Sequence, residues 1–104
     1  MDTSLDLKFA EQSEAIVTQL GFKNLKSFVK NQTLIILMAK IEKFEMENRQ
    51  FETKYHMPFK KFQAKIEKLQ NEEHFSEEDD YLDWRFATES MNRLKKQKLD
   101  IEYA

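Results

Sequence analysis

Glycine and proline are almost absent from this chain, and their scarcity constrains its fold more than any other feature. Gly21 and Pro58 are the only residues of these two types among 104. Turns depend on such residues, whereas the abundant Lys, Glu, Gln, Leu and Met residues lose little rotamer freedom in a helix. The sequence therefore predicts a mostly α-helical protein that is interrupted near Gly21 and near Pro58.

The composition fits one small domain without disulfides. With 40% hydrophobic and 35% charged residues, the chain can build one modest core. Cysteine is absent from the sequence, which suits a reducing compartment. The chain opens without the basic and apolar pattern of a secretory signal, and its most apolar run, residues 34–39, is far shorter than the ~20 residues that span a bilayer. We therefore expect a cytoplasmic protein that does not enter a membrane.

Residues 5–9 alternate apolar and polar side chains, the period of a strand with one buried face. A short strand needs a partner, and no other segment alternates convincingly, so the expected mate is the same strand of a second copy. A helix is expected from Glu11 to Gly21, and another after Asn24, which is suited to be its N-cap. The expected fold class is therefore mostly α, with a short N-terminal β-strand followed by a helix-turn-helix in a homodimer.

A paired strand of this kind can enter the major groove of DNA. Ser4, Asp6 and Lys8 would then project from one face of the ribbon. The alternative is a ribbon that only dimerises, which Asp6 favours because a carboxylate repels phosphates. The net charge of -2 also argues against broad nucleic-acid binding.

The remainder of the chain is expected to form a long connecting helix and two C-terminal amphipathic helices. Residues 34–38 are apolar on every side of a helix, which places the expected dimer core there. Residues 57–58 should end the long helix, and Ser76 should cap the last one. We divide the chain into a dimerisation and possible DNA-binding module (1–40), a connecting helix (41–57) and an acidic and aromatic partner-binding arm (58–104).

Catalysis and metal binding find little support in the sequence. The two histidines, His56 and His74, have no spacing that recommends either as an acid, base or ligand. His74 lies among acids and resembles a metal site, but the paired Glu-x-x-His motifs of a di-iron bundle are missing, so a solvated acidic turn is the better interpretation. We expect neither enzymatic activity nor a cofactor.

Residues 77–86 combine acids and aromatics on one expected helix. Aromatic side chains dominate interface hot spots, and acids steer a basic partner toward them. The segment is therefore a candidate docking surface. The alternative is an ordinary helix that folds onto the chain's own apolar stripe of Phe59, Phe62 and Ile66.

Two sets of segments resemble the antitoxins of toxin-antitoxin systems. The runs 5–9 and 20–29 resemble ribbon-helix-helix repressors, and the runs 54–62 and 79–84 are similar to the C-terminal arms of small antitoxins paired with ribonuclease-type toxins. The resemblance implies a homodimer that represses its own operon, with the strand on operator DNA and Lys23, Asn24 and Lys26 touching phosphates. It also implies an arm that neutralises a small basic toxin through these residues: Phe59, Phe62, Asp79, Asp80, Tyr81, Leu82, Asp83, Trp84, Phe86 and Met91.

A helical adaptor without a DNA role is the main alternative function. Ile41, Phe44 and Phe51 would then form a seam that pairs with another helix. Loss of DNA retardation with rising salt would separate an operator-binding protein from such an adaptor.

Overall fold

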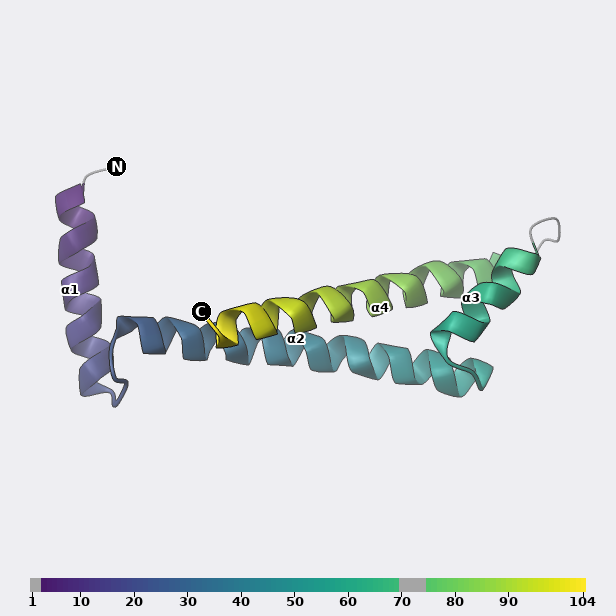
Figure 1. The fold of residues 1–104 in the computed structure, drawn as a ribbon, viewed down its shortest axis with the longest axis horizontal. Coiled ribbons are helices and arrows are strands. Elements are labelled where there is room, and N and C mark those ends of the chain that lie inside the picture. The colour runs from purple at the N-terminus through teal and green to yellow at the C-terminus, as the bar shows by residue number, and fades with distance from the viewer. Residues whose placement is uncertain (1–2, 70–74) are drawn as a thin grey trace.

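The computed structural model describes residues 3–69 and 75–104, which form α-helices joined by short turns (Figure 1). The helices are α1 (Thr3–Gln19), α2 (Leu25–Tyr55), α3 (Phe59–Lys68) and α4 (Phe75–Glu102). The chain is elongated, with extents of 63 × 30 × 21 Å. The prediction of a mostly helical protein is confirmed.

The predicted N-terminal strand is wrong, and with it the ribbon-helix-helix fold. Residues 5–9 lie inside α1, and the described residues contain no β-strand. A strand on its own leaves its backbone donors and acceptors without partners, whereas a helix satisfies them within one segment. Thr3–Gln19 contains neither glycine nor proline, so no residue within this segment interrupts the helix.

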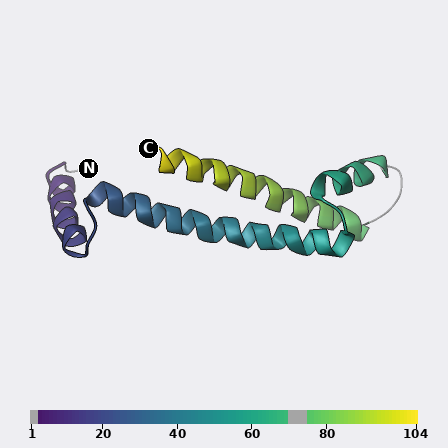
Figure 2. The same cartoon turned by 60° about the horizontal axis from the view of Figure 1, so that its bottom comes forward.

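Two long helices, α2 and α4, run side by side and form a helical hairpin (Figure 2). α2 is continuous from residue 25 to 55 and therefore runs through position 40 without a break. Its stripe of Ile41, Phe44 and Phe51 faces α4, where Phe44 packs edge-on against Phe86. The last helix is amphipathic, as predicted, because Trp84, Ala87 and Leu94 are buried on one face of α4.

At one end of the hairpin α3 connects α2 to α4 and packs against α4, and we call this the closed end. At the other end α2 begins and α4 finishes, and we call this the open end (Figure 1). Trp84 lies at the centre of an aromatic cluster at the closed end. Its ring stacks on Phe51 at 5.5 Å between centroids and contacts Phe59 and Phe62 at 5.4 and 5.2 Å. Burial of Trp84 and Phe62 is complete, so the core of the fold lies at this end.

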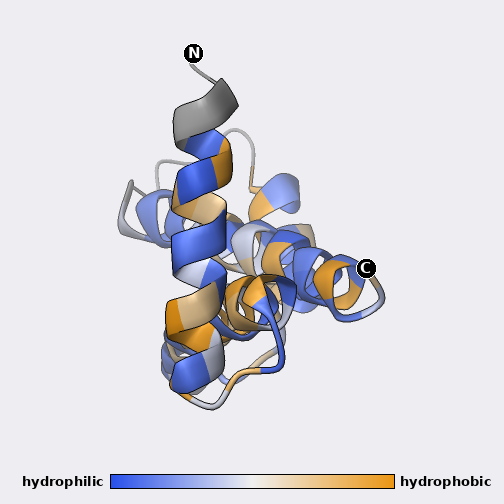
Figure 3. Cartoon of the chain, turned by 90° about the vertical axis from the view of Figure 1, so that its left-hand side faces the viewer, coloured by the Kyte–Doolittle hydropathy of each residue, from blue (hydrophilic) through white to orange (hydrophobic). Residues whose placement is uncertain are grey.

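α1 stands across the open end of the hairpin, as the view along the long axis shows (Figure 3). Gly21 makes the joint possible, because its φ of 103° lies in the region that only glycine adopts without strain. Asn24 then caps α2 by accepting a hydrogen bond from the Ser27 amide at 2.8 Å. Phe22 packs edge-on against Phe28, 5.1 Å away. The predicted helix stop at Gly21 and N-cap at Asn24 are confirmed.

The turn between α2 and α3 lies where Pro58 predicts it. His56 caps α2 in the left-handed conformation with φ 57°, and Pro58 precedes the first residue of α3. The predicted N-cap at Ser76 is wrong, because α4 already includes Phe75. The acidic turn expected around His74 lies partly outside the described residues.

Candidate functional site

A buried side-chain amide joins the two long helices next to the aromatic cluster. Asn48 of α2 accepts hydrogen bonds from the indole Nε1 of Trp84 at 2.9 Å and from the Thr88 hydroxyl at 2.8 Å. Its own amide nitrogen donates to the Phe44 carbonyl oxygen at 2.9 Å. Asn48 is only 8% exposed and Trp84 is fully buried, so these bonds form away from water. The network pins α2 and α4 in one register.

A second polar contact closes the hairpin beside the aromatic cluster. The Asp80 carboxylate pairs with Lys54 Nζ at 2.6 Å and accepts a hydrogen bond from the Tyr55 hydroxyl. Burial and the contact with Asp80 raise the pKa of Tyr55 well above its ordinary value. Burial acts to raise the pKa of Asp80, but the hydrogen bonds from Lys54 and Tyr55 outweigh it and lower that pKa. Both shifts favour a protonated tyrosine beside an ionised aspartate.

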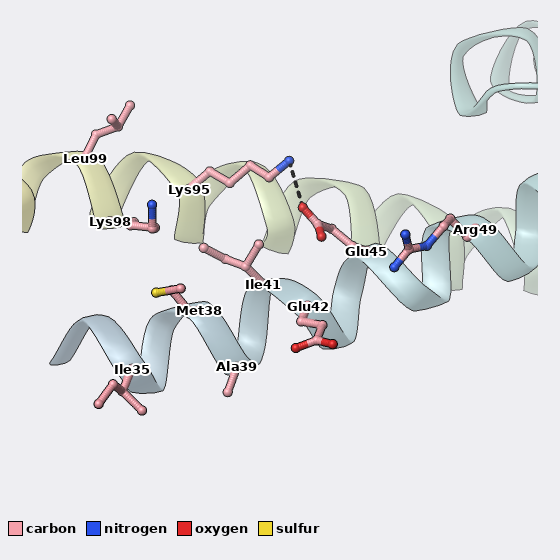
Figure 4. A pocket seen from close by; sticks show the side chains of 10 residues that line it. All are labelled: Ile35, Met38, Ala39, Ile41, Glu42, Glu45, Arg49, Lys95, Lys98 and Leu99. Atoms are coloured by element: carbon pink, nitrogen blue, oxygen red, sulfur yellow. Dashed lines mark ion pairs between the residues drawn. The ribbon is translucent and has the colours of Figure 1, made fainter. Parts of the chain in front are cut away.

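An open groove follows α2 and α4 toward the open end of the hairpin (Figure 4). Ile41 points toward α4, whereas Ile35 and Ala39 point away from it, and Leu99 adds an apolar wall from α4. The volume of the groove is about 860 Å³. It is lined by Ile35, Met38, Ala39, Ile41, Glu42, Glu45, Arg49, Lys95, Lys98 and Leu99.

The charged residues of this groove differ between its walls. α2 contributes Glu42, Glu45 and Arg49, whereas α4 contributes only bases, Lys95 and Lys98. Lys95 Nζ lies 3.3 Å from Glu45 Oε1 across the groove. Both side chains are well exposed, so this ion pair adds little stability. The groove therefore combines an apolar lining with charges that water already solvates. It provides a surface for binding, without an arrangement of groups that could carry out a reaction.

The residues predicted to contact DNA lie on α1 and around the start of α2. Asp6 and Lys8 are exposed on α1, where positions two apart point in different directions, and Ser4 also belongs to this helix. Asn24 uses its side-chain oxygen to cap α2, while Lys23 and Lys26 are exposed. The two-stranded ribbon that would have presented the first three residues does not exist in the described residues.

The residues predicted to contact a toxin divide into two groups. Trp84 and Phe62 are fully buried, and Phe59, Tyr81, Asp80 and Met91 are partly buried in the hairpin. Phe59 stacks on Tyr81 at 5.9 Å, which is the self-packing alternative stated for the last helix. The other four predicted residues, Asp79, Leu82, Asp83 and Phe86, are exposed on α4.

The candidate chemical groups do not come together in the part of the chain that the structure describes. His56 is an exposed helix cap, and His74 lies outside the described residues. Within that part, no three His, Asp or Glu side chains are close enough to hold a metal ion. None of the described helices has both the length and the apolar character needed to cross a membrane.

Sequence reasoning missed Asn48 and the groove. An asparagine inside a helical stripe carries little signal, although its place between Phe44 and Phe51 on the same face marks it as inward-facing. The groove depends on how α4 lies along α2, which hydrophobic spacing does not specify. A partial signal was present in the apolar residues 34–38, which exceed what one neighbouring helix can cover.

Fold and site define a helical hairpin protein with an apolar groove at its surface. No protein-family model matches the chain, and no curated protein or solved structure gives a significant match. The comparisons therefore assign no family, and the resemblance to antitoxins stays a prediction.

Proposed function

We propose that this protein is a helical adaptor that binds a helix of another polypeptide along the groove between α2 and α4. The proposal rests on apolar surface left uncovered there: Ile35, Met38 and Leu99 are 53, 54 and 54% exposed. Clustered apolar side chains with a polar rim are typical of protein interaction sites. An amphipathic helix laid into such a groove removes them from water.

The charges on the two walls would orient the incoming helix. Lys95 and Lys98 make the α4 wall basic, which favours a partner helix that carries acids along the edge facing α4. Rim charges of this kind affect the rate of association more than the affinity. Affinity is expected to come from the apolar lining.

Photo-cross-linking in the native cells tests the proposal. A photoreactive residue replaces Met38 in the groove, and a control chain carries it at Glu78, an exposed position on α4 outside the groove. We expect a discrete covalent adduct at Met38 and none of the same mass at Glu78. Equal labelling at both positions, or no adduct at Met38, would contradict the proposal.

A second candidate function is neutralisation of a small basic toxin by the first half of α4. The observation that favours it is an exposed strip that alternates acids with large apolar residues, in which Leu82 is 54% and Phe86 62% exposed beside Asp79 and Asp83. Acids would speed the approach of a basic protein, and the apolar residues would supply contact area.

A growth assay tests this candidate. The product of each adjacent gene is expressed alone and together with this chain, and a toxic product should lose its toxicity in the presence of the chain. Asp79→Lys with Asp83→Lys should weaken that protection, whereas Asp100→Lys, at the far end of α4, should not. Absence of a toxic neighbour, or protection that survives both reversals, would rule the candidate out.

A further inference from the structure

α2 carries a second apolar face on the side turned away from α4. Figure 4 shows Ile35, Ala39 and Glu42 pointing away from α4 on the same side of the helix. They belong to a series spaced alternately four and three residues apart, which is the spacing of the a and d positions of a coiled coil. We call this series the α2 seam, and it consists of Phe28, Gln32, Ile35, Ala39, Glu42 and Met46.

Apart from Phe28, which is partly buried against Phe22, the residues of the α2 seam are all exposed. In two views α3 and α4 lie on the opposite side of α2 (Figures 1 and 2). Ile35 and Met46 in the seam are 53 and 51% exposed, and Ile36 and Met38 on its two edges are 57 and 54% exposed. An apolar face of this width on a helix is normally packed against another element.

The seam is complementary to itself when two copies run antiparallel. A two-fold axis at position 37 places Phe28 opposite Met46 of the second copy. It places Ile35 opposite Ala39, so that a large side chain meets a small one. It also sets the Gln32 amide, a donor, against the Glu42 carboxylate, an acceptor. Each seam residue thus finds a partner that suits its size or its hydrogen-bonding capacity.

A parallel pair would match the same residues badly. Glu42 would meet Glu42, and two carboxylates held together in a contact repel each other. Ala39 would meet Ala39 and leave a gap beside the larger residues of the seam. The seam therefore discriminates between the two orientations.

We infer that a second copy of this chain occupies the α2 seam, with the two α2 helices antiparallel over positions 28–46. The contact spans about 27 Å at 1.5 Å per residue, and it is isologous, since the same surface is used on both copies. The inference rests on the proposed function, because it names the polypeptide that covers the apolar residues shared by seam and groove. It also gives residues 34–38 the enclosure that their composition requires.

Sedimentation equilibrium of the full chain is the first test. We expect a mass twice the 12.6 kDa of one chain. Ile35→Glu buries a charge against Ala39 twice per dimer and should raise the dimer dissociation constant about 100-fold or more. Leu82→Glu is the matched control, because Leu82 has a similar exposure of 54% but lies on α4. A dimer that Ile35→Glu leaves intact would overturn the inference.

Disulfide trapping tests the register, and the sequence helps because it contains no cysteine. Gln32→Cys and Glu42→Cys chains are mixed and oxidised. The antiparallel seam predicts a disulfide between the two different variants, since like positions are about 15 Å apart along the helix and beyond the reach of a disulfide. Disulfides between identical variants would overturn the inference.

The two proposals fail in different ways. A wild-type chain that stays monomeric at the highest concentration that remains in solution overturns the second copy as occupant. A Met38 adduct with a different polypeptide would still support the adaptor. A monomer without any adduct at Met38 would refute both.

Discussion

Replacing Asn48 by leucine isolates the contribution of the buried amide that joins α2 and α4. Leucine has a similar size but neither accepts nor donates a hydrogen bond. The substitution therefore leaves the Trp84 Nε1 hydrogen without its acceptor in a place where Trp84 is fully buried. The Thr88 hydroxyl loses the same acceptor, but Thr88 is only partly buried.

The expected loss of stability follows from these two groups. A buried donor without an acceptor costs about 1 to 3 kcal/mol, and loss of the Thr88 bond adds roughly 0.5 to 1.5 kcal/mol. Added apolar burial by leucine offsets part of this, so we expect a net loss of about 2 kcal/mol in the free energy of unfolding. Total stability of a domain is about 5 to 15 kcal/mol, so the loss would be readily measured.

Urea unfolding followed by circular dichroism gives the measurement, at one fixed protein concentration because self-association changes apparent stability. A double-mutant cycle with Trp84→Phe separates the indole bond from general packing, and we expect a coupling energy of about 1 to 2 kcal/mol. Asn92→Leu is the control, an exposed asparagine on α4 whose substitution should change stability by less than about 0.5 kcal/mol.

The result that would refute the reasoning is an Asn48→Leu chain as stable as the wild type. In that case the indole of Trp84 must find another acceptor when the amide is removed. A coupling energy near zero would lead to the same conclusion, because the two side chains would then contribute independently.

Substitutions at three further positions address the ends of the hairpin. The pKa of Asp80 is lowered in the folded state, so its contribution to stability is present above the ordinary value near 3.9 and disappears as the pH falls through the folded value. The pKa of Tyr55 is raised, chiefly by burial and then by Asp80, so its contribution is present below about 10 and disappears as the pH rises beyond it. Asp80→Asn should therefore flatten the acid limb of a plot of unfolding free energy against pH and only reduce the alkaline limb, because the burial of Tyr55 remains. Gly21→Ala should cost about 1 kcal/mol from its φ of 103° alone, since nothing lies within 4 Å of the added carbon, and hydrogen exchange should localise the effect to α1. Asn24→Ala should cost about 1 kcal/mol, and Asn24→Ser, which can still cap α2, should recover most of it in thermal unfolding.

The sequence predicts the structure correctly where a short segment determines its own conformation. Gly21 ends a helical region because no other residue adopts its φ so readily, and Asn24 caps the next helix with its own side chain. The stripe through Trp84 and Leu94 repeats at the helical period over many turns, so the buried face of α4 is readable from the sequence.

The sequence does not predict the structure where the conformation of a segment depends on residues far away in the chain. Alternation over residues 5–9 fits a strand only if a second strand exists to pair with it, and none does among the described residues. The bond between Tyr55 and Asp80 joins two helices whose relative register no local pattern specifies. In a sequence, an aromatic residue such as Trp84 is equally typical of a hydrophobic core and of a binding interface. The packing of α3 against α4 places Trp84 in the core, and this packing cannot be read from local sequence.

The uneven distribution of buried residues along the hairpin has a consequence for its motions. Complete burial is concentrated around Trp84 and Phe62, whereas the open end is held by lesser contacts such as the bond from Lys30 Nζ to the Glu102 carbonyl oxygen. Opening fluctuations should therefore begin at the tips of α2 and α4 and stop at the aromatic cluster. The helical turns nearest the apolar surfaces would then be the most mobile in an isolated chain, and covering those surfaces would suppress that motion.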